Sequence, residues 1–139
     1  RDRSVLHIAK ENIKEIEVKG KTNFTLKANV KGELILDPPR ATDAQRASAF
    51  ASELADFNGH KFYREANLPP HYGKIKIVLS AGITKEIDFY GPTKNDEFVV
   101  KSTDTREPVT IGKSKIDVFF PRVEDMVDKT GSINVAPPK

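Results

Sequence analysis

Alternation of apolar and polar residues predicts short β-strands along much of this chain. In the first third, the predicted strands are residues 13–18, 23–28 and 33–36, preceded by a short apolar edge strand at 4–8. Prolines at 38 and 39 end the third strand, because proline has no amide hydrogen to donate to a β-ladder. The connections are short, so we expect an antiparallel meander.

The same alternation returns in the second half of the chain. Strands are predicted there at 74–79, 84–90, 97–101 and 108–111. Residues 60–65 form an extended segment or a short strand, and two prolines make a stiff loop of residues 68–73. These segments predict a second meander.

Helical spacing is clearest at 42–59. Apolar side chains recur there at offsets of three, four and seven residues, namely Ala47, Phe50, Ala51, Leu54 and Phe57. Thr42 and Gln45 have the spacing of a capping box, and Asn58 and Gly59 stand where a left-handed C-cap belongs. The pattern predicts an amphipathic helix that packs against the sheet.

A second helix is predicted from Ser114, which we expect to cap it, to about Thr130 and Gly131. Its apolar residues keep helical spacing and are Ile116, Phe119, Phe120, Val123, Met126 and Val127. Pro121 is expected to break or kink this helix, or to be the first residue of a new turn.

These elements predict an α+β fold. We expect a mostly antiparallel sheet of about six to seven strands in two meanders, each followed by a helix packed on the sheet. Residues 1–131 form a single domain in this interpretation, with a loose duplication of 13–59 and 74–130. Residues 132–139 are expected to be a flexible tail.

Composition narrows the function classes. The chain has 139 residues, a net charge of +3 and no cysteine, which excludes disulfides and thiolate chemistry in this sequence. Basic and acidic residues are interspersed, so we do not expect a nucleic-acid partner. Such a partner would need Lys14, Lys19, Lys27 and Lys31 gathered on one face.

Motifs for catalysis are incomplete. The sequence IGKS at 111–114 lacks the earlier glycine of a phosphate-binding loop, since Glu107 stands in that position. The three histidines show no metal-binding spacing. Glu86 and Asp88 alternate with apolar Ile87 and Phe89, which favours a solvated strand face over acid–base catalysis. We therefore expect no catalytic residue, metal or cofactor.

The most suggestive cluster is aromatic. Phe62, Tyr63, His71 and Tyr72 flank the proline-rich loop, and aromatic residues beside rigid prolines can form a protein- or peptide-binding surface. In the alternative interpretation, Phe62 and Tyr72 fill the seam between sheet and helix.

The order of these segments resembles the bacterial domain of unknown function family 4340. The resemblance covers most of residues 13–129. It is carried by NIKEIEV, a TLK-type strand, a strand that ends in prolines, the helix ATDAQRASAFASELADF, the segment NLPPHYGKIKIVL, IDFYG and the closing unit EFVVKSTDTREPVTIGKSKIDVFF.

The resemblance implies an extracytoplasmic protein, periplasmic or anchored to the bacterial envelope through an upstream segment or lipid. It also implies proximity to membrane transport components of the gliding-motility auxiliary kind, and no enzymatic activity or cofactor. We therefore expect a non-enzymatic interaction or scaffold module with an envelope or membrane protein as its partner. The alternative is a small-ligand or peptide-binding module.

Overall fold

The computed structural model describes residues 2–129, which form ten strands and two α-helices. Eight strands make one sheet. They are β2 (Ile13–Lys19), β3 (Phe24–Ala28), β4 (Leu34–Asp37), β6 (Lys61–Phe62), β7 (His71–Leu79), β8 (Thr84–Tyr90), β9 (Phe98–Ser102) and β10 (Val109–Ile111). Their order across the sheet is β4-β3-β2-β7-β8-β9-β10-β6, and all neighbours are antiparallel. The α+β class and the antiparallel sheet are confirmed.

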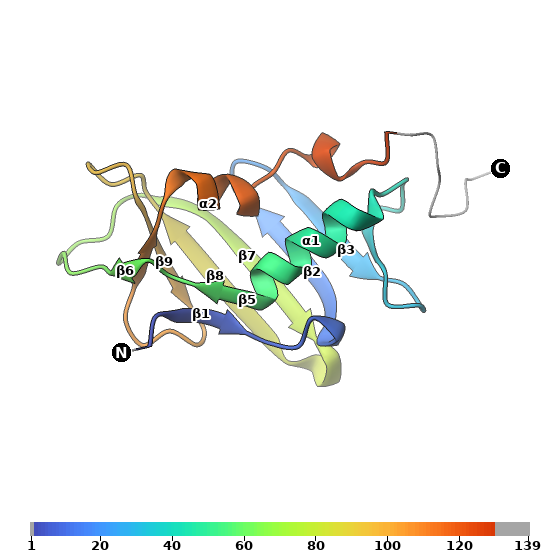
Figure 1. The fold of residues 1–139 in the computed structure, drawn as a ribbon, viewed down its shortest axis with the longest axis horizontal. Helices are drawn as coiled ribbons and strands as arrows, with labels where there is room; N and C mark the ends of the chain where they lie inside the picture. Colours follow the sequence, from blue (N-terminus) through green and yellow to red (C-terminus); the bar gives the residue numbers. More distant parts are fainter. Residues whose placement is uncertain (1, 130–139) are drawn as a thin grey trace.

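A second layer covers one face of this sheet (Figure 1). It contains α1 (Ala44–Ala55), α2 (Lys113–Phe119) and a small antiparallel sheet of β1 (Ser4–His7) and β5 (Asp56–Asn58). Short 3₁₀ turns occur at Lys10–Asn12, Ser80–Gly82 and Val123–Met126. The expected edge strand at 4–8 therefore exists, but it pairs within the second layer.

The core lies between the two layers. Along β7, buried Ile75, Ile77 and Leu79 alternate with partly exposed Lys74 and Lys76, so one face of the strand is apolar. Rings from three elements meet above it, with the Phe57 centroid 4.4 Å from that of Phe119 and 6.3 Å from that of Phe89. Burial of such large rings is a main source of stability in a domain of this size.

The boundaries of α1 differ from the prediction at both ends. Asp43, rather than Thr42, is the N-cap, and its carboxylate accepts hydrogen bonds from the amides of Gln45 and Arg46, both at 3.1 Å. The helix ends at Ala55, where the chain enters β5. Gly59 is therefore not a helix cap. It permits a close backbone approach, because a Cβ there would lie 2.4 Å from the Val109 side chain.

The predicted second helix is also shorter than expected. Gly112 is the N-cap of α2 and Ser114 makes no capping bond, so the prediction of a Ser114 cap is wrong. The helix ends at Phe119, just before Pro121, and the chain continues into the 3₁₀ turn Val123–Met126. The predicted end at Thr130 and Gly131, and the tail at 132–139, lie outside the described residues.

The free side of β4 is covered by the chain itself. The buried Thr42 hydroxyl accepts a hydrogen bond from the Leu36 amide at 3.0 Å and donates one to the Arg40 carbonyl at 2.9 Å. Thr42 also forms a β-bridge with Val127. The segment around Thr42 thus protects one edge of the sheet, while β6 ends the sheet on the other side.

Within residues 2–129, no helix combines the length and the apolar character needed to span a bilayer.

Candidate functional site

A groove of about 600 Å³ opens between two loops that lie next to β6. One wall is the loop that connects β6 to β7, and the other is the turn that connects β8 to β9. We call this feature the loop groove and define it by its lining residues, which are Lys61, Phe62, Tyr63, Arg64, Glu65, Ala66, Asn67, Leu68, Pro69, Pro92, Thr93, Lys94, Asn95, Glu97 and Thr110.

Hydrogen bonds fix the shape of both walls. The Tyr63 hydroxyl donates to the Asn67 carbonyl at 2.6 Å and closes the first loop on itself. The Thr93 hydroxyl oxygen accepts from the Glu97 amide at 3.1 Å and holds the second loop. The Gly91 amide donates to the Pro70 carbonyl at 2.8 Å and joins the two loops. With prolines in both walls, the loop groove is largely preformed.

Apolar side chains supply much of the lining. Leu68 is 39% exposed, which is unusual for a large apolar residue in this chain. Phe62 and Tyr63 are half-buried, and the Arg64 guanidinium lies 5.3 Å from the centroid of the Phe62 ring. The groove therefore offers apolar and aromatic surface that a bound segment can cover.

The charged residues of the loop groove fall into two groups. Lys61 pairs with Glu97 at 3.5 Å, and Arg64 pairs with Glu107, just outside the groove, at 3.6 Å. Within residues 2–129, Lys94 on one wall and Glu65 on the other form no ion pair or hydrogen bond.

The four aromatic residues singled out in the sequence are not brought together. Phe62 and Tyr63 line the loop groove. Tyr72 turns toward the core, with its ring centroid 5.0 Å from that of Phe98 and 5.2 Å from that of Phe120. This burial raises the pKa of the Tyr72 hydroxyl, and nearby Asp117 raises it further while Lys113 lowers it.

His71 lies on the opposite face of the sheet. Its Nε2 is 2.9 Å from an Asp88 carboxylate oxygen, and its ring meets that of Tyr90 edge-on at 5.1 Å. A β-bulge between His71 and Gly73 accompanies this separation of His71 from Tyr72. Because the bulge interrupts the regular alternation of the strand, His71 lies on the uncovered face with Asp88 while Tyr72 packs against the core.

The uncovered face of the sheet carries charges that neutralise one another. In the strand register, Lys76 lies between Glu17 and Glu86, and Asp88 lies between Lys74 and Lys101. Glu86 and Asp88, considered above as an acid–base pair, lie 3.2 and 3.9 Å from the Lys74 ammonium nitrogen. The hydrogen bond with Glu86 and the charge of Asp88 raise the pKa of Lys74.

The lysines that a nucleic acid would need are also neutralised in part. Lys19 lies 3.7 Å from a Glu17 oxygen, and Lys27 lies 3.5 Å from an Asp37 oxygen. The charge pattern on this face is therefore mixed, where a polyanion would favour a continuous basic patch.

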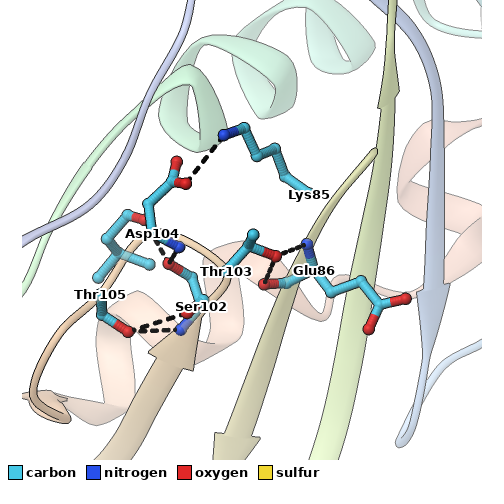
Figure 2. Close-up of polar contacts among 7 residues, drawn as sticks. Lys85, Glu86, Ser102, Thr103, Asp104 and Thr105 are labelled. Atoms are coloured by element: carbon cyan, nitrogen blue, oxygen red, sulfur yellow. Dashed lines mark hydrogen bonds and ion pairs between the residues drawn. The ribbon is translucent and has the colours of Figure 1, made fainter. Parts of the chain in front are cut away.

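A dense polar cluster occurs at the turn after β9 (Figure 2). The Thr103 hydroxyl oxygen accepts from the Glu86 amide at 2.9 Å, and the Thr105 hydroxyl oxygen accepts from the Ser102 amide at 2.8 Å. Asp104 pairs with Lys85 at 2.8 Å. The Ser102 hydroxyl donates to the Val5 carbonyl at 2.6 Å, which ties β1 to β9. These groups bond to the backbone or to each other, so the cluster stabilises a turn.

A metal site would require several side chains that share one ion. In the part of the chain that the structure describes, no group of three or more His, Asp or Glu side chains is arranged to hold a metal ion. His7 bridges β1 and β5, with Nδ1 2.8 Å from an Asp56 carboxylate oxygen and Nε2 3.2 Å from the Asn58 amide oxygen.

The described residues form further hollows elsewhere on the surface. One, of about 310 Å³, lies between α1 and α2 and includes Phe50, Val118 and Met126. Another, of about 500 Å³, lies beside β4 and includes Lys10, Lys31 and Leu34. The loop groove differs from both because its walls are two hydrogen-bonded, proline-containing loops.

Three residues of the loop groove were not among the candidate binding residues chosen from the sequence, namely Leu68, Pro92 and Lys94. Pro69 and Pro92 mark stiff loops in the sequence, but nothing local indicates that residues 63–69 face residues 92–97. That arrangement arises from the pairing of β6 with β10.

Comparisons of this chain with protein-family models, with curated proteins and with solved structures found no match.

Proposed function

We propose that this protein is a non-enzymatic interaction module that binds a segment of a partner protein in the loop groove. The observation that carries the proposal is a preformed groove lined by exposed Leu68 and by half-buried Phe62 and Tyr63. Aromatic and apolar anchors dominate the energetics of many protein interfaces, and rigid walls lower the entropic cost of binding.

The paired charges of the uncovered sheet face make that face a less favourable binding surface than the loop groove. Lys74 and Lys76 lie opposite carboxylates on neighbouring strands, so these groups are satisfied without a partner. Covering them would remove water from paired charges and gain little apolar burial. In the loop groove, by contrast, an apolar side chain placed on Leu68 would gain roughly 25 cal/mol for each Å² buried.

We further propose that the protein acts outside the cytoplasm, in the periplasm or anchored to the envelope of a bacterium. The partner in this proposal is an envelope or membrane protein of a transport or gliding-motility type complex. The support for this part is the resemblance of residues 13–129 to the bacterial domain of unknown function family 4340.

Affinity capture from bacterial envelope extract tests the docking function. Three baits are compared, namely the wild type, Leu68→Ser and Val118→Ser. Leu68 and Val118 are both 39% exposed, and Val118 lies on α2 and does not line the loop groove, so the last bait is a matched control.

The wild type and Val118→Ser should retain the same protein, and Leu68→Ser should retain roughly three- to sevenfold less. Complete burial of an exposed leucine contributes roughly 1.5–3 kcal/mol, and 1.4 kcal/mol is tenfold in affinity. Because Leu68 is only 39% exposed, a partner that covers it gains a corresponding fraction of that free energy. Equal capture by all three baits would contradict docking in the loop groove.

A small-ligand or peptide-binding module is the second candidate. The volume of about 600 Å³ favours it, because pockets for small molecules occupy about 300–1,000 Å³. Binding of a low-molecular-weight fraction of the extract, lost in Leu68→Ser and kept in Val118→Ser, would favour this candidate over a protein partner.

A further inference from the structure

We propose that the segment bound in the loop groove is an extended peptide that carries a carboxylate against Lys94 and a cation against Glu65, next to an apolar side chain. This inference rests on the proposed docking function. It adds the chemistry and the orientation of the partner segment.

The charges of the two walls carry the argument. Lys61 and Arg64 are each neutralised by a carboxylate of this chain, at 3.5 and 3.6 Å. Lys94 and Glu65 are exposed and, among the residues described, pair with no other side chain. A partner that covers the groove removes water from these two groups, which is unfavourable unless opposite charges face them.

The positions of Glu65 and Lys94 also set the orientation of the bound segment. Glu65 belongs to the loop between β6 and β7, and Lys94 belongs to the turn between β8 and β9, so the two charges lie on opposite walls. Asp96 is in the same turn as Lys94 but does not line the groove. A segment that binds in the reverse direction would place like charges together, which costs affinity.

An extended backbone fits this arrangement. Successive side chains of an extended peptide point to opposite sides, so residues at odd spacing face opposite walls. The carboxylate and the cation of the partner are therefore expected at odd spacing. The apolar side chain is expected at even spacing from the cation, because Leu68 and Pro69 share a wall with Glu65.

Selection from a displayed library of random peptides tests this inference. The immobilised proteins are the wild type, Lys94→Glu, Glu65→Lys, Leu68→Ser and the control Lys14→Glu. Lys14 is an exposed lysine of β2, several strands away from β6, and forms no ion pair with the described residues.

Wild type and Lys14→Glu should enrich the same peptides, with an acidic and a basic residue at odd spacing and an apolar residue at even spacing from the basic one. Lys94→Glu should bind those peptides about tenfold more weakly and select a basic residue at the acidic position. Glu65→Lys should select an acidic residue at the position where the wild type selects a basic one.

Two results would overturn the inference. Enrichment of the same peptides by wild type, Lys94→Glu and Glu65→Lys, but not by Leu68→Ser, would show apolar docking without charge selection and leave the proposed function standing. If none of the immobilised proteins enriches peptides, or if Leu68→Ser enriches the same peptides as the wild type, both the inference and docking in the loop groove are contradicted.

Discussion

The hydroxyl group of Thr42 helps to close one edge of the large sheet. It accepts a hydrogen bond from the Leu36 amide at 3.0 Å, and Thr42 is only 1% exposed. An unpaired amide at the end of a sheet can recruit another strand, so this bond protects both stability and solubility.

Replacement of Thr42 by valine should therefore destabilise the protein by about 1–3 kcal/mol. Valine has nearly the same shape but leaves the buried Leu36 amide without this acceptor. Urea denaturation monitored by circular dichroism measures the change. Thr42→Ser keeps the hydroxyl and is the matched control, and equal losses in both variants would contradict this account.

Tyr72 provides a second prediction at this scale, through the raised pKa of its hydroxyl. Burial is the main cause, so the folded protein keeps the proton to higher pH than the unfolded chain does. The associated stability is complete below the unfolded pKa of about 10 and is lost as pH rises through the folded pKa.

Titration of tyrosinate absorbance should accordingly show a late step that disappears in Tyr72→Phe. Tyr90 also has a raised pKa, mainly from burial and secondly from the charge of Asp88, so its own late step remains in that variant. A titration curve that Tyr72→Phe leaves unchanged in this region would contradict the half-buried position of Tyr72.

At the scale of elements, β1 is held in the second layer by more than its pairing with β5. Val5 and Leu6 are 0% and 1% exposed, and the Val5 carbonyl accepts a hydrogen bond from the hydroxyl of Ser102 in β9. β1 is therefore part of the core, although it is short and close to the start of the chain.

Truncation of Leu6 to alanine should cost about 2–5 kcal/mol, as expected when a fully buried leucine leaves a cavity. The matched substitution Ile83→Ala removes methyl groups from a side chain that is 53% exposed and should change stability by less than about 0.5 kcal/mol. Urea denaturation of both variants checks this, and a similar small effect in both would mean that β1 does not pack as described.

The length of each element decided how well the sequence predicted it. Regular alternation located β8 at its observed bounds, Thr84–Tyr90, whereas β5 and β6 have only three and two residues and are too short to show a period. Phe57 fits the apolar stripe of α1 and also points into the core from β5, so spacing alone could not separate a longer helix from a helix followed by a strand.

At the scale of the whole molecule, the loop groove depends on contacts between distant parts of the chain. Pairing of Phe62 with Val109 places β6 at the end of the sheet, and the hydrogen bond from the Gly91 amide to the Pro70 carbonyl brings the two walls together. Local patterns identified Phe62 and Tyr63 as candidates but could not reveal Lys94 or Pro92, because their role depends on the tertiary fold.

The central claim, that a partner binds in the loop groove, can be tested directly by photo-crosslinking. A photoreactive phenylalanine analogue replaces Leu68 in one protein and Val118 in another, and each is irradiated in bacterial envelope extract. The two positions are equally exposed, at 39%, but only Leu68 lines the loop groove. We predict one specific covalent adduct from position 68 and none from position 118. Adducts of the same protein from both positions, or from position 118 alone, would contradict the claim.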